Sequence, residues 1–202
     1  MFIQVIQGRC SDADRLRKQL DLWEQDLAPG ADGFLGSTGG LTDDGTFVAV
    51  IRFDSRDQAD ASSSRPEQDA WWQETSTTCF DGEVAFHDYD DAFTMLDGGS
   101  DDAGFVQVMQ GRVDDAAGFR SFMQAPMDGL RDMRPEIIGG TVAVADDGQF
   151  TQTVYFTSQE AAREGEKKDM PEQVERDMEA GMGQMHDLTY FDLPDPWFAG
   201  RA

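Results

Sequence analysis

Two side chains in the first half of the sequence could bind and deprotonate a small acidic molecule. Arg52 lies in a predicted strand over residues 46–53, where its guanidinium could anchor a substrate oxyanion. The alternative is a structural pairing with a carboxylate, because a buried arginine needs a partner. His87 lies in a predicted closing strand and could act as a general base, because histidine titrates near neutral pH. The alternative for His87 is a surface or interface role.

Two adjacent tryptophans, Trp71 and Trp72, are candidates for binding an aromatic ligand by ring stacking. They follow Pro66, which is well placed to begin a helix. Neighbouring helix positions point about 100° apart, so only one of the two can face a pocket well. The alternative is that one tryptophan belongs to the core and the other is half-exposed packing.

The sequence positions these residues within an internal repeat. Residues 2–9, FIQVIQGR, return as residues 105–112, FVQVMQGR, with six of eight positions identical at a shift of 103. The same shift carries Asp44-Gly45 onto Asp147-Gly148. A repeat of this length predicts two copies of one domain. We expect a first repeat over residues 1–92, an acidic and glycine-containing linker over 93–104, and a second repeat over 105–202.

Three further polar residues are candidates for substrate binding. Gln4 and Gln107 occupy the same position of the two first strands, where a buried amide needs a partner. They either bond across an interface or line a pocket. Tyr155 corresponds to Arg52 and could donate a hydrogen bond from its phenol. Because the tryptophan pair, Arg52 and His87 occur only in the first copy, we expect a site in the first repeat.

Each copy is predicted to follow the order β-α-β-β-α-β, a ferredoxin-like α+β fold. Strands are predicted over residues 2–7, 34–41, 46–53 and 83–89, and in the second copy over 105–110, 137–144, 149–156 and 187–192. A bend is expected at Pro126, and a new helix is expected to begin at Pro171. Asp-Gly supplies hairpin turns in both copies. With both faces of the four-stranded sheets apolar, we expect the two repeats to pack sheet to sheet as an intrachain dimeric α/β barrel.

Composition narrows the classes of partner. The chain has 40 acidic and 16 basic residues, a net charge of -24 that repels nucleic acid and anionic membrane. Cys10 and Cys79 have no metal-ligand spacing and are expected to be free thiols. No leader or membrane-spanning stretch is expected. We expect a soluble cytoplasmic protein with no metal site, no nucleic-acid partner and no membrane partner.

The opening Phe-x-Gln-Val-x-Gln-Gly-Arg, the helix from Arg65-Pro66-Glu67 to Trp71-Trp72, and Phe86-His87-Asp88 carry a resemblance that covers nearly the whole chain. The sequence resembles the antibiotic-biosynthesis-monooxygenase-like branch of the dimeric α/β-barrel superfamily, in a tandem form similar to that of actinobacteria. Family members that oxidise aromatic polyketides work without metal or flavin, and haem-degrading members use Asn, Trp and a ligating His. This sequence contains no Asn, and Gln4 and Gln107 are the first-strand amides that could replace it.

The resemblance implies a cofactor-independent monooxygenase that acts on a small aromatic metabolite. The alternative is a non-catalytic protein of the same fold, either a small-ligand binder or a stress-related scaffold. A haem-degrading enzyme is a third hypothesis. No cofactor is expected for the first two. The expected partner is a small aromatic ligand, and further oligomerisation of the pseudo-dimer stays open.

Overall fold

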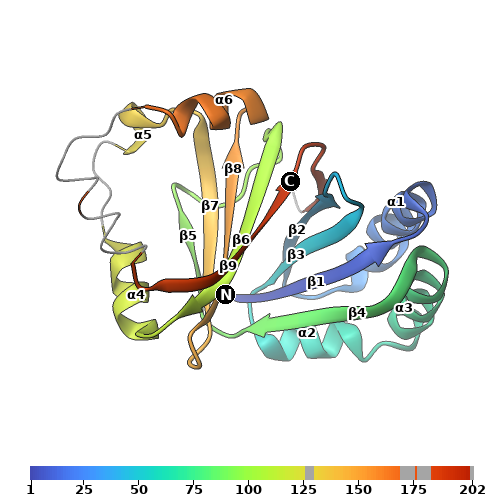
Figure 1. Cartoon of the computed structure of the whole chain (residues 1–202). Helices are drawn as coiled ribbons and strands as arrows, with labels where there is room; N and C mark the ends of the chain where they lie inside the picture. The colour runs from blue at the N-terminus through green and yellow to red at the C-terminus, as the bar shows by residue number, and fades with distance from the viewer. Residues whose placement is uncertain (126–129, 169–175, 177–182, 201–202) are drawn as a thin grey trace. The chain divides into compact units, whose positions relative to one another are not determined.

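The computed structural model describes residues 1–125, 130–168, 176 and 183–200. The chain divides into two compact units (Figure 1). The first unit contains residues 1–90 together with residues 196–202, and the second contains residues 91–195. The last residues of the chain therefore belong to the unit that the first residues build.

The first unit is an antiparallel sheet with the order β10-β2-β3-β1-β4. Its strands are β1 (Phe2–Cys10), β2 (Phe34–Leu41), β3 (Thr46–Phe53), β4 (Phe80–Tyr89) and β10 (Trp197–Ala199). Its helices are α1 (Ala13–Leu22), the π-helix η1 (Trp23–Leu27), the 3-10 helix η2 (Ala28–Gly30), α2 (Arg56–Ser63) and α3 (Pro66–Cys79). The order β2-β3-β1-β4 is the predicted ferredoxin-like pattern, and the α+β class is confirmed.

The second unit repeats this sheet with the order β5-β7-β8-β6-β9. Its strands are β5 (Ala92–Met95), β6 (Phe105–Val113), β7 (Ile137–Val144), β8 (Gln149–Phe156) and β9 (Met185–Leu193). Its helices include α4 (Ala116–Gln124), α5 (Leu130–Met133) and α6 (Gln159–Gly165). The bend expected at Pro126 and the helix expected at Pro171 lie outside the described residues.

The fifth strand of each sheet comes from the chain that follows the other repeat. Strand β5 follows the first repeat in sequence and pairs with β7, with Phe93 opposite Val142. Strand β10 follows the second repeat and pairs with β2, with Trp197 opposite Gly39. The expected sheets had four strands, and the expected linker over residues 93–104 had none. The difference has a physical reason: an edge strand leaves backbone N–H and C=O groups unpaired, and these short segments satisfy them.

Strand alternation sorts the first sheet into two faces. Gln4 and Ile6 of β1 lie opposite Ile51 and Ala49 of β3, and these four residues share the face that carries the helices. Val50 belongs to the other face and is fully buried. The hairpin between β2 and β3 places Gly45 at φ 82°, and the matching hairpin places Gly148 at φ 86°, which confirms the predicted Asp-Gly turns.

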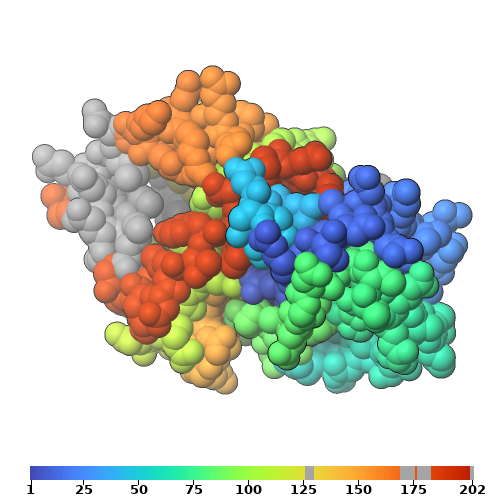
Figure 2. All heavy atoms as spheres, turned by 45° about the vertical axis from the view of Figure 1, so that its right-hand side comes forward, coloured from blue at the N-terminus to red at the C-terminus, as the bar shows by residue number. Residues whose placement is uncertain are grey.

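Helices α1 and α3 pack against each other, and the blue and green atoms of the first unit meet on the face that Figure 2 shows. Helix α1 is capped by Asp12, whose side chain accepts a hydrogen bond from the N–H of Arg15. Leu16 points into a core cluster with Phe47 and Phe80. After Leu22 the helix widens into the π-helical turn η1, a form common at functional sites.

Candidate functional site

A cavity of about 240 Å³ lies between the helices and the sheet of the first unit. Every residue that lines it belongs to this unit. The chain has four tryptophans, and all of them line the cavity: Trp23, Trp71, Trp72 and Trp197. We call it the tryptophan cavity. Its volume is on the scale of one small organic molecule.

The aromatic side chains around the tryptophan cavity form a connected series. Trp71 lies between Trp23 and Trp72, with ring centroids 6.3 and 6.1 Å away. Trp72 makes an edge contact with Phe86 at 5.3 Å. From β10, Trp197 reaches Phe47 at 6.1 Å. Rings held in contact this way present faces and edges that suit a flat aromatic ligand.

The floor of the cavity is made by small residues on two neighbouring strands. Gly39 of β2 and Ala49 of β3 are cross-strand partners, and both line the cavity. The corresponding pair in the second repeat is Val142 and Gln152, which are also cross-strand partners. Val142 is fully buried there and belongs to a packed cluster. The missing side-chain volume at Gly39 and Ala49 thus leaves space over the first sheet.

A buried hydroxyl on α3 also lines the cavity. Thr75 is 1% exposed, and its Oγ1 has no hydrogen-bond partner in the described structure. Its neighbours Ser76, Thr77 and Thr78 each donate to a backbone carbonyl of the preceding turn. An unmade hydrogen bond in a buried site is unfavourable, so the Thr75 hydroxyl is suited to bond a ligand.

The indole N–H groups divide into two pairs. Trp71 Nε1 donates to the carbonyl of Gln19 at 2.9 Å, and Trp23 Nε1 donates to Gln68 Oε1 at 2.7 Å. For Trp72 and Trp197, the described residues provide no acceptor for Nε1. The first two rings are therefore fixed by the protein, whereas the other two retain a donor for ligand or water.

The charged residues that line the cavity are all exposed and all lie on helices. Arg17 Nε lies 3.2 Å from Asp21 Oδ1, and the guanidinium carbon of Arg17 lies 5.3 Å from the centre of the Trp197 ring. Glu24 and Asp69 also line the cavity and are exposed. Because the charged groups lie at solvent and the walls are aromatic, we call these four residues the rim.

The structure brings together some of the predicted site residues and separates others. Trp71, Trp72 and Gln4 line the tryptophan cavity, whereas Arg52 and His87 do not. Arg52 lies opposite Ile3 and His87 opposite Val5, so strand alternation directs both to the other face of the sheet. This geometry separates both residues from the tryptophans that line the cavity. Arg52 Nη1 donates to Thr38 Oγ1 at 3.2 Å.

The two remaining predicted residues, Gln107 and Tyr155, belong to the second unit and do not line this cavity. Tyr155 is fully buried in β8. Gln107 Nε2 donates to Asp192 Oδ1 at 2.8 Å, and Arg163 of α6 also bonds this carboxylate. The guanidinium carbon of Arg163 lies 5.5 Å from the ring centre of Phe105.

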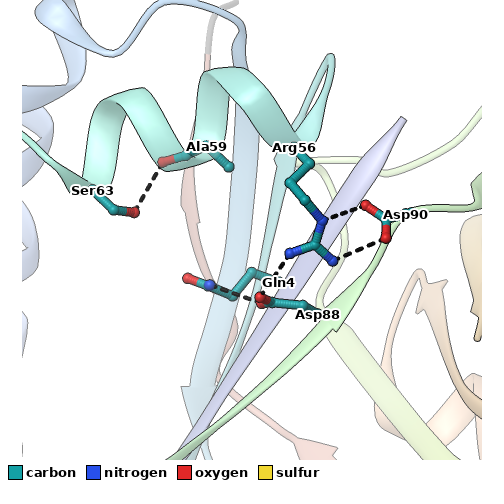
Figure 3. A network of polar contacts seen from close by, with 6 residues as sticks. All are labelled: Gln4, Arg56, Ala59, Ser63, Asp88 and Asp90. Atoms are coloured by element: carbon teal, nitrogen blue, oxygen red, sulfur yellow. Dashed lines mark hydrogen bonds and ion pairs between the residues drawn. The ribbon is translucent and has the colours of Figure 1, made fainter.

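Gln4 takes part in the same arrangement in the first unit (Figure 3). Its Nε2 donates to Asp88 Oδ1 at 2.9 Å, and Arg56 of α2 donates to Asp88 Oδ2 at 3.3 Å. Arg56 lies over the Phe2 ring at 4.8 Å and also bonds Asp90. The hydrogen bond from Arg56 lowers the pKa of Asp90. Both repeats contain this network. In each repeat it ties the first strand to the closing strand and to a helix.

Sequence reasoning missed the residues that create the cavity. Gly39 and Ala49 could have been found by comparing the repeats position by position, because their counterparts Val142 and Gln152 are larger. Thr75 is one of four consecutive hydroxyl residues, and nothing in its type separates it from the others. Trp197 gave no signal, because its strand forms only by pairing with distant β2.

The described residues contain no group of three or more histidine, cysteine or acidic side chains placed to hold a metal ion. Cys10 and Cys79 are free, and burial raises the pKa of the Cys10 thiol. Within the part of the chain that the structure describes, no helix has the length and apolar character needed to cross a membrane.

Comparison with solved structures places this fold among oxygenase-like proteins. A candidate monooxygenase of Lactobacillus acidophilus NCFM superposes with a TM-score of 0.72 at 14% identity, over 98% of this chain and 98% of that one. A candidate monooxygenase of Fusobacterium nucleatum gives a TM-score of 0.74 at 7% identity, over 100% and 94%. The fold is monooxygenase-like. An anthrone oxidase-like protein gives 0.66 at 10% identity, over 99% and 94%.

These structures match this chain over nearly its whole length, so the likeness includes both repeats. At such low identity it is a likeness of fold. No protein-family model and no curated protein matches the sequence. Function must therefore be argued from the tryptophan cavity itself.

Proposed function

We propose that this monooxygenase-like chain binds a small aromatic molecule in the tryptophan cavity of its first repeat. The observation that carries the proposal is the convergence of all four tryptophans on one cavity of about 240 Å³. Clustered tryptophans around empty space are suited to stacking, because a ligand ring replaces water against several apolar faces at once.

A second observation supports binding in an oriented way. The Thr75 hydroxyl and the Trp72 indole N–H lie on the lining without a protein partner in the described residues. Ligand sites in proteins are mostly apolar with a few polar groups that fix orientation. One polar atom on an otherwise flat aromatic molecule would satisfy Thr75.

Tryptophan fluorescence of the purified protein tests this proposal. Quinoline, 2-naphthol and anthrone are titrated in turn, with N-acetyltryptophanamide as the control for collisional quenching and inner-filter effects. We expect saturable quenching with one site per chain, weakened in Trp72→Phe. The absence of saturable quenching by every probe up to its solubility limit would contradict the proposal.

A monooxygenase reaction in the same cavity is the second candidate, favoured by the fold that this chain shares with the candidate monooxygenases. One reaction of this class converts a ring CH2 to C=O with O2, releasing one water. Oxygen uptake with anthrone, together with anthraquinone detected by mass spectrometry, would support it. Binding of anthrone without oxygen uptake would contradict this candidate and leave ligand binding intact.

The lining makes binding the better supported of the two. Among the described residues, no histidine, cysteine, tyrosine or lysine lines the tryptophan cavity. The carboxylates on the lining belong to the exposed rim, and histidine is the most frequent general acid or base, so a reaction among the aromatic walls would depend mainly on the substrate's own reactivity. The third hypothesis, haem degradation, is not supported at this site, because neither His87 nor His186 lines the cavity to offer an axial imidazole.

A further inference from the structure

The charge on a ligand can be inferred from the rim and walls of the tryptophan cavity, given the proposed function. The single cationic group on the lining, Arg17, is in an ion pair with Asp21 and lies over Trp197. Within the described part of the chain, Glu24 and Asp69 are in no ion pair. The rim therefore carries two uncompensated carboxylates.

The aromatic walls of the cavity also favour a positively charged ligand. The face of an indole ring is negative, so a cation over it is attracted, most strongly by tryptophan among the aromatic side chains. Arg17 over Trp197 shows that this cavity already accepts a cation in such a position. Four indoles and a rim of carboxylates thus act together on a positively charged ligand.

Long-range electrostatics adds to the local arrangement. The chain carries a net charge of -24, which repels anions and concentrates cations near the surface at moderate ionic strength. An anionic aromatic molecule would approach the rim against this field. Once bound, the anion would stack on electron-rich rings. The cationic group on the lining, Arg17, is already paired with Asp21.

A buried hydroxyl on the cavity lining indicates where a neutral polar atom of the ligand would bond. Thr75 is 1% exposed, and its hydroxyl is without a partner, whereas the next three hydroxyl residues of α3 bond the helix backbone. This hydroxyl cannot neutralise a charge, but it can bond a neutral polar atom. The cation belongs near the tryptophans and rim, and the neutral polar atom belongs at Thr75.

We infer that the natural ligand of the tryptophan cavity is a lipophilic organic cation, a flat aromatic molecule with a quaternary or protonated nitrogen. The inference rests on the proposed function and narrows it to a charge class. It predicts a preference for cations over neutral and anionic molecules of the same ring size. The preference depends on Glu24 and Asp69 and is independent of acidic residues elsewhere on the same helices.

Isothermal titration calorimetry with three two-ring probes tests this inference: N-methylquinolinium as the cation, quinoline as the neutral molecule and 2-naphthoate as the anion. At pH 8 and 100 mM salt, we expect N-methylquinolinium to bind about tenfold more tightly than quinoline, within the range of desolvated cation–π contacts. We expect 2-naphthoate to bind more weakly than both.

A pair of double variants with equal net charge separates the rim from the general field. Glu24→Gln with Asp69→Asn removes the uncompensated rim carboxylates. The control, Asp14→Asn with Asp26→Asn, removes two exposed carboxylates of the rim helices that neither line the cavity nor form an ion pair within the described residues. We expect the rim variant to lose about fivefold in affinity for the cation, because two exposed carboxylates each contribute a weak local attraction while the indoles remain. We expect the control to lose less than twofold, because its carboxylates act only through the screened field.

The outcomes distinguish failure of the inference from failure of the proposed function. Equal affinity for cation and quinoline, tighter binding of 2-naphthoate, or equal losses in the two double variants would overturn the cationic ligand while aromatic binding stands. Binding of none of the three probes would overturn both. Retention of quinoline affinity in the rim variant, with a reduced cation preference, would support the inference and show that the variant is folded.

Discussion

Gly39 and Ala49 lie directly opposite each other on β2 and β3, and together they form the floor of the tryptophan cavity. Their counterparts, Val142 and Gln152, occupy the same cross-strand positions in the second repeat. Two repeats of one fold thus differ in whether small side chains leave room above the sheet. The cavity is a consequence of absent volume as much as of the aromatic rings around it.

Filling this floor should block the ligand without harming the fold. We expect Ala49→Leu to reduce affinity for quinoline at least tenfold, because the added carbon atoms occupy the cavity. We expect its stability to stay within about 1 kcal/mol of wild type, since filling an existing cavity avoids overpacking. Ala85→Leu, on the exposed part of β4, is the control. Unchanged quinoline affinity in Ala49→Leu would show that the ligand binds elsewhere.

The unpartnered hydroxyl of Thr75 leads to a prediction about stability. We expect Thr75→Val to stabilise the ligand-free protein by about 1 kcal/mol, because it removes an unsatisfied buried polar group and keeps the β-branched shape. The same change should weaken binding of a ligand whose polar atom reaches this hydroxyl. Urea denaturation provides the stability, and calorimetry provides the affinity.

Thr77→Val is the matched control, because Thr77 lies on the same helix, is exposed and bonds the carbonyl of Gln73. We expect it to change neither quantity appreciably. Destabilisation by Thr75→Val, comparable to loss of a satisfied hydrogen bond, would mean that the Thr75 hydroxyl has a partner in the empty protein.

The network at Gln4 and its copy at Gln107 should contribute to stability equally. We expect Asp88→Ala and Asp192→Ala each to lower the free energy of unfolding by roughly 0.5–1 kcal/mol, since both carboxylates are about one-third exposed and accept bonds from a glutamine and an arginine. Asp192→Ala should leave quinoline affinity unchanged. A large effect of Asp88→Ala alone would give the first network a role beyond structure.

The free energy of unfolding should depend on pH through the ionisation of Asp90. Its pKa is lowered chiefly by the hydrogen bond from Arg56, so the ionised form is favoured in the folded state. This contribution is present above the ordinary aspartate pKa of about 3.9 and is lost as pH falls through the lower folded value. We expect Arg56→Gln to lower the urea midpoint at pH 7 and to lower it less at pH 2.5. Arg15→Gln, an exposed arginine of α1, is the control. If the difference in urea midpoint between wild type and Arg56→Gln stayed the same at both pH values, the role given to Asp90 would be contradicted.

Much of the fold follows from periodicity and turn chemistry. Alternating apolar residues predicted β1, β3, β7 and β8, and Asp-Gly predicted both hairpins with glycine at positive φ. The short edge strands β5 and β10 were not predicted, because three or four residues form a strand only when a distant edge pairs with them. The π-helical turn at Trp23–Leu27 was not predicted either.

The candidate site was predictable only in part. Trp71 and Trp72 stood out by residue type, and both line the cavity. Arg52 and His87 were chosen for their chemistry, yet each alternates to the other face of its strand. Glycine and alanine at the floor carry no functional groups, so reasoning from reactive side chains passes over them.

Fluorine NMR tests most directly whether one aromatic molecule occupies a cavity lined by all four tryptophans. The protein is labelled with 5-fluorotryptophan, its four resonances are assigned with single Trp→Phe variants, and quinoline or N-methylquinolinium is added. We expect all four resonances to shift along saturation curves with one dissociation constant. Resonances that stay in place at the solubility limit of both probes, or a shift confined to one tryptophan, would contradict it.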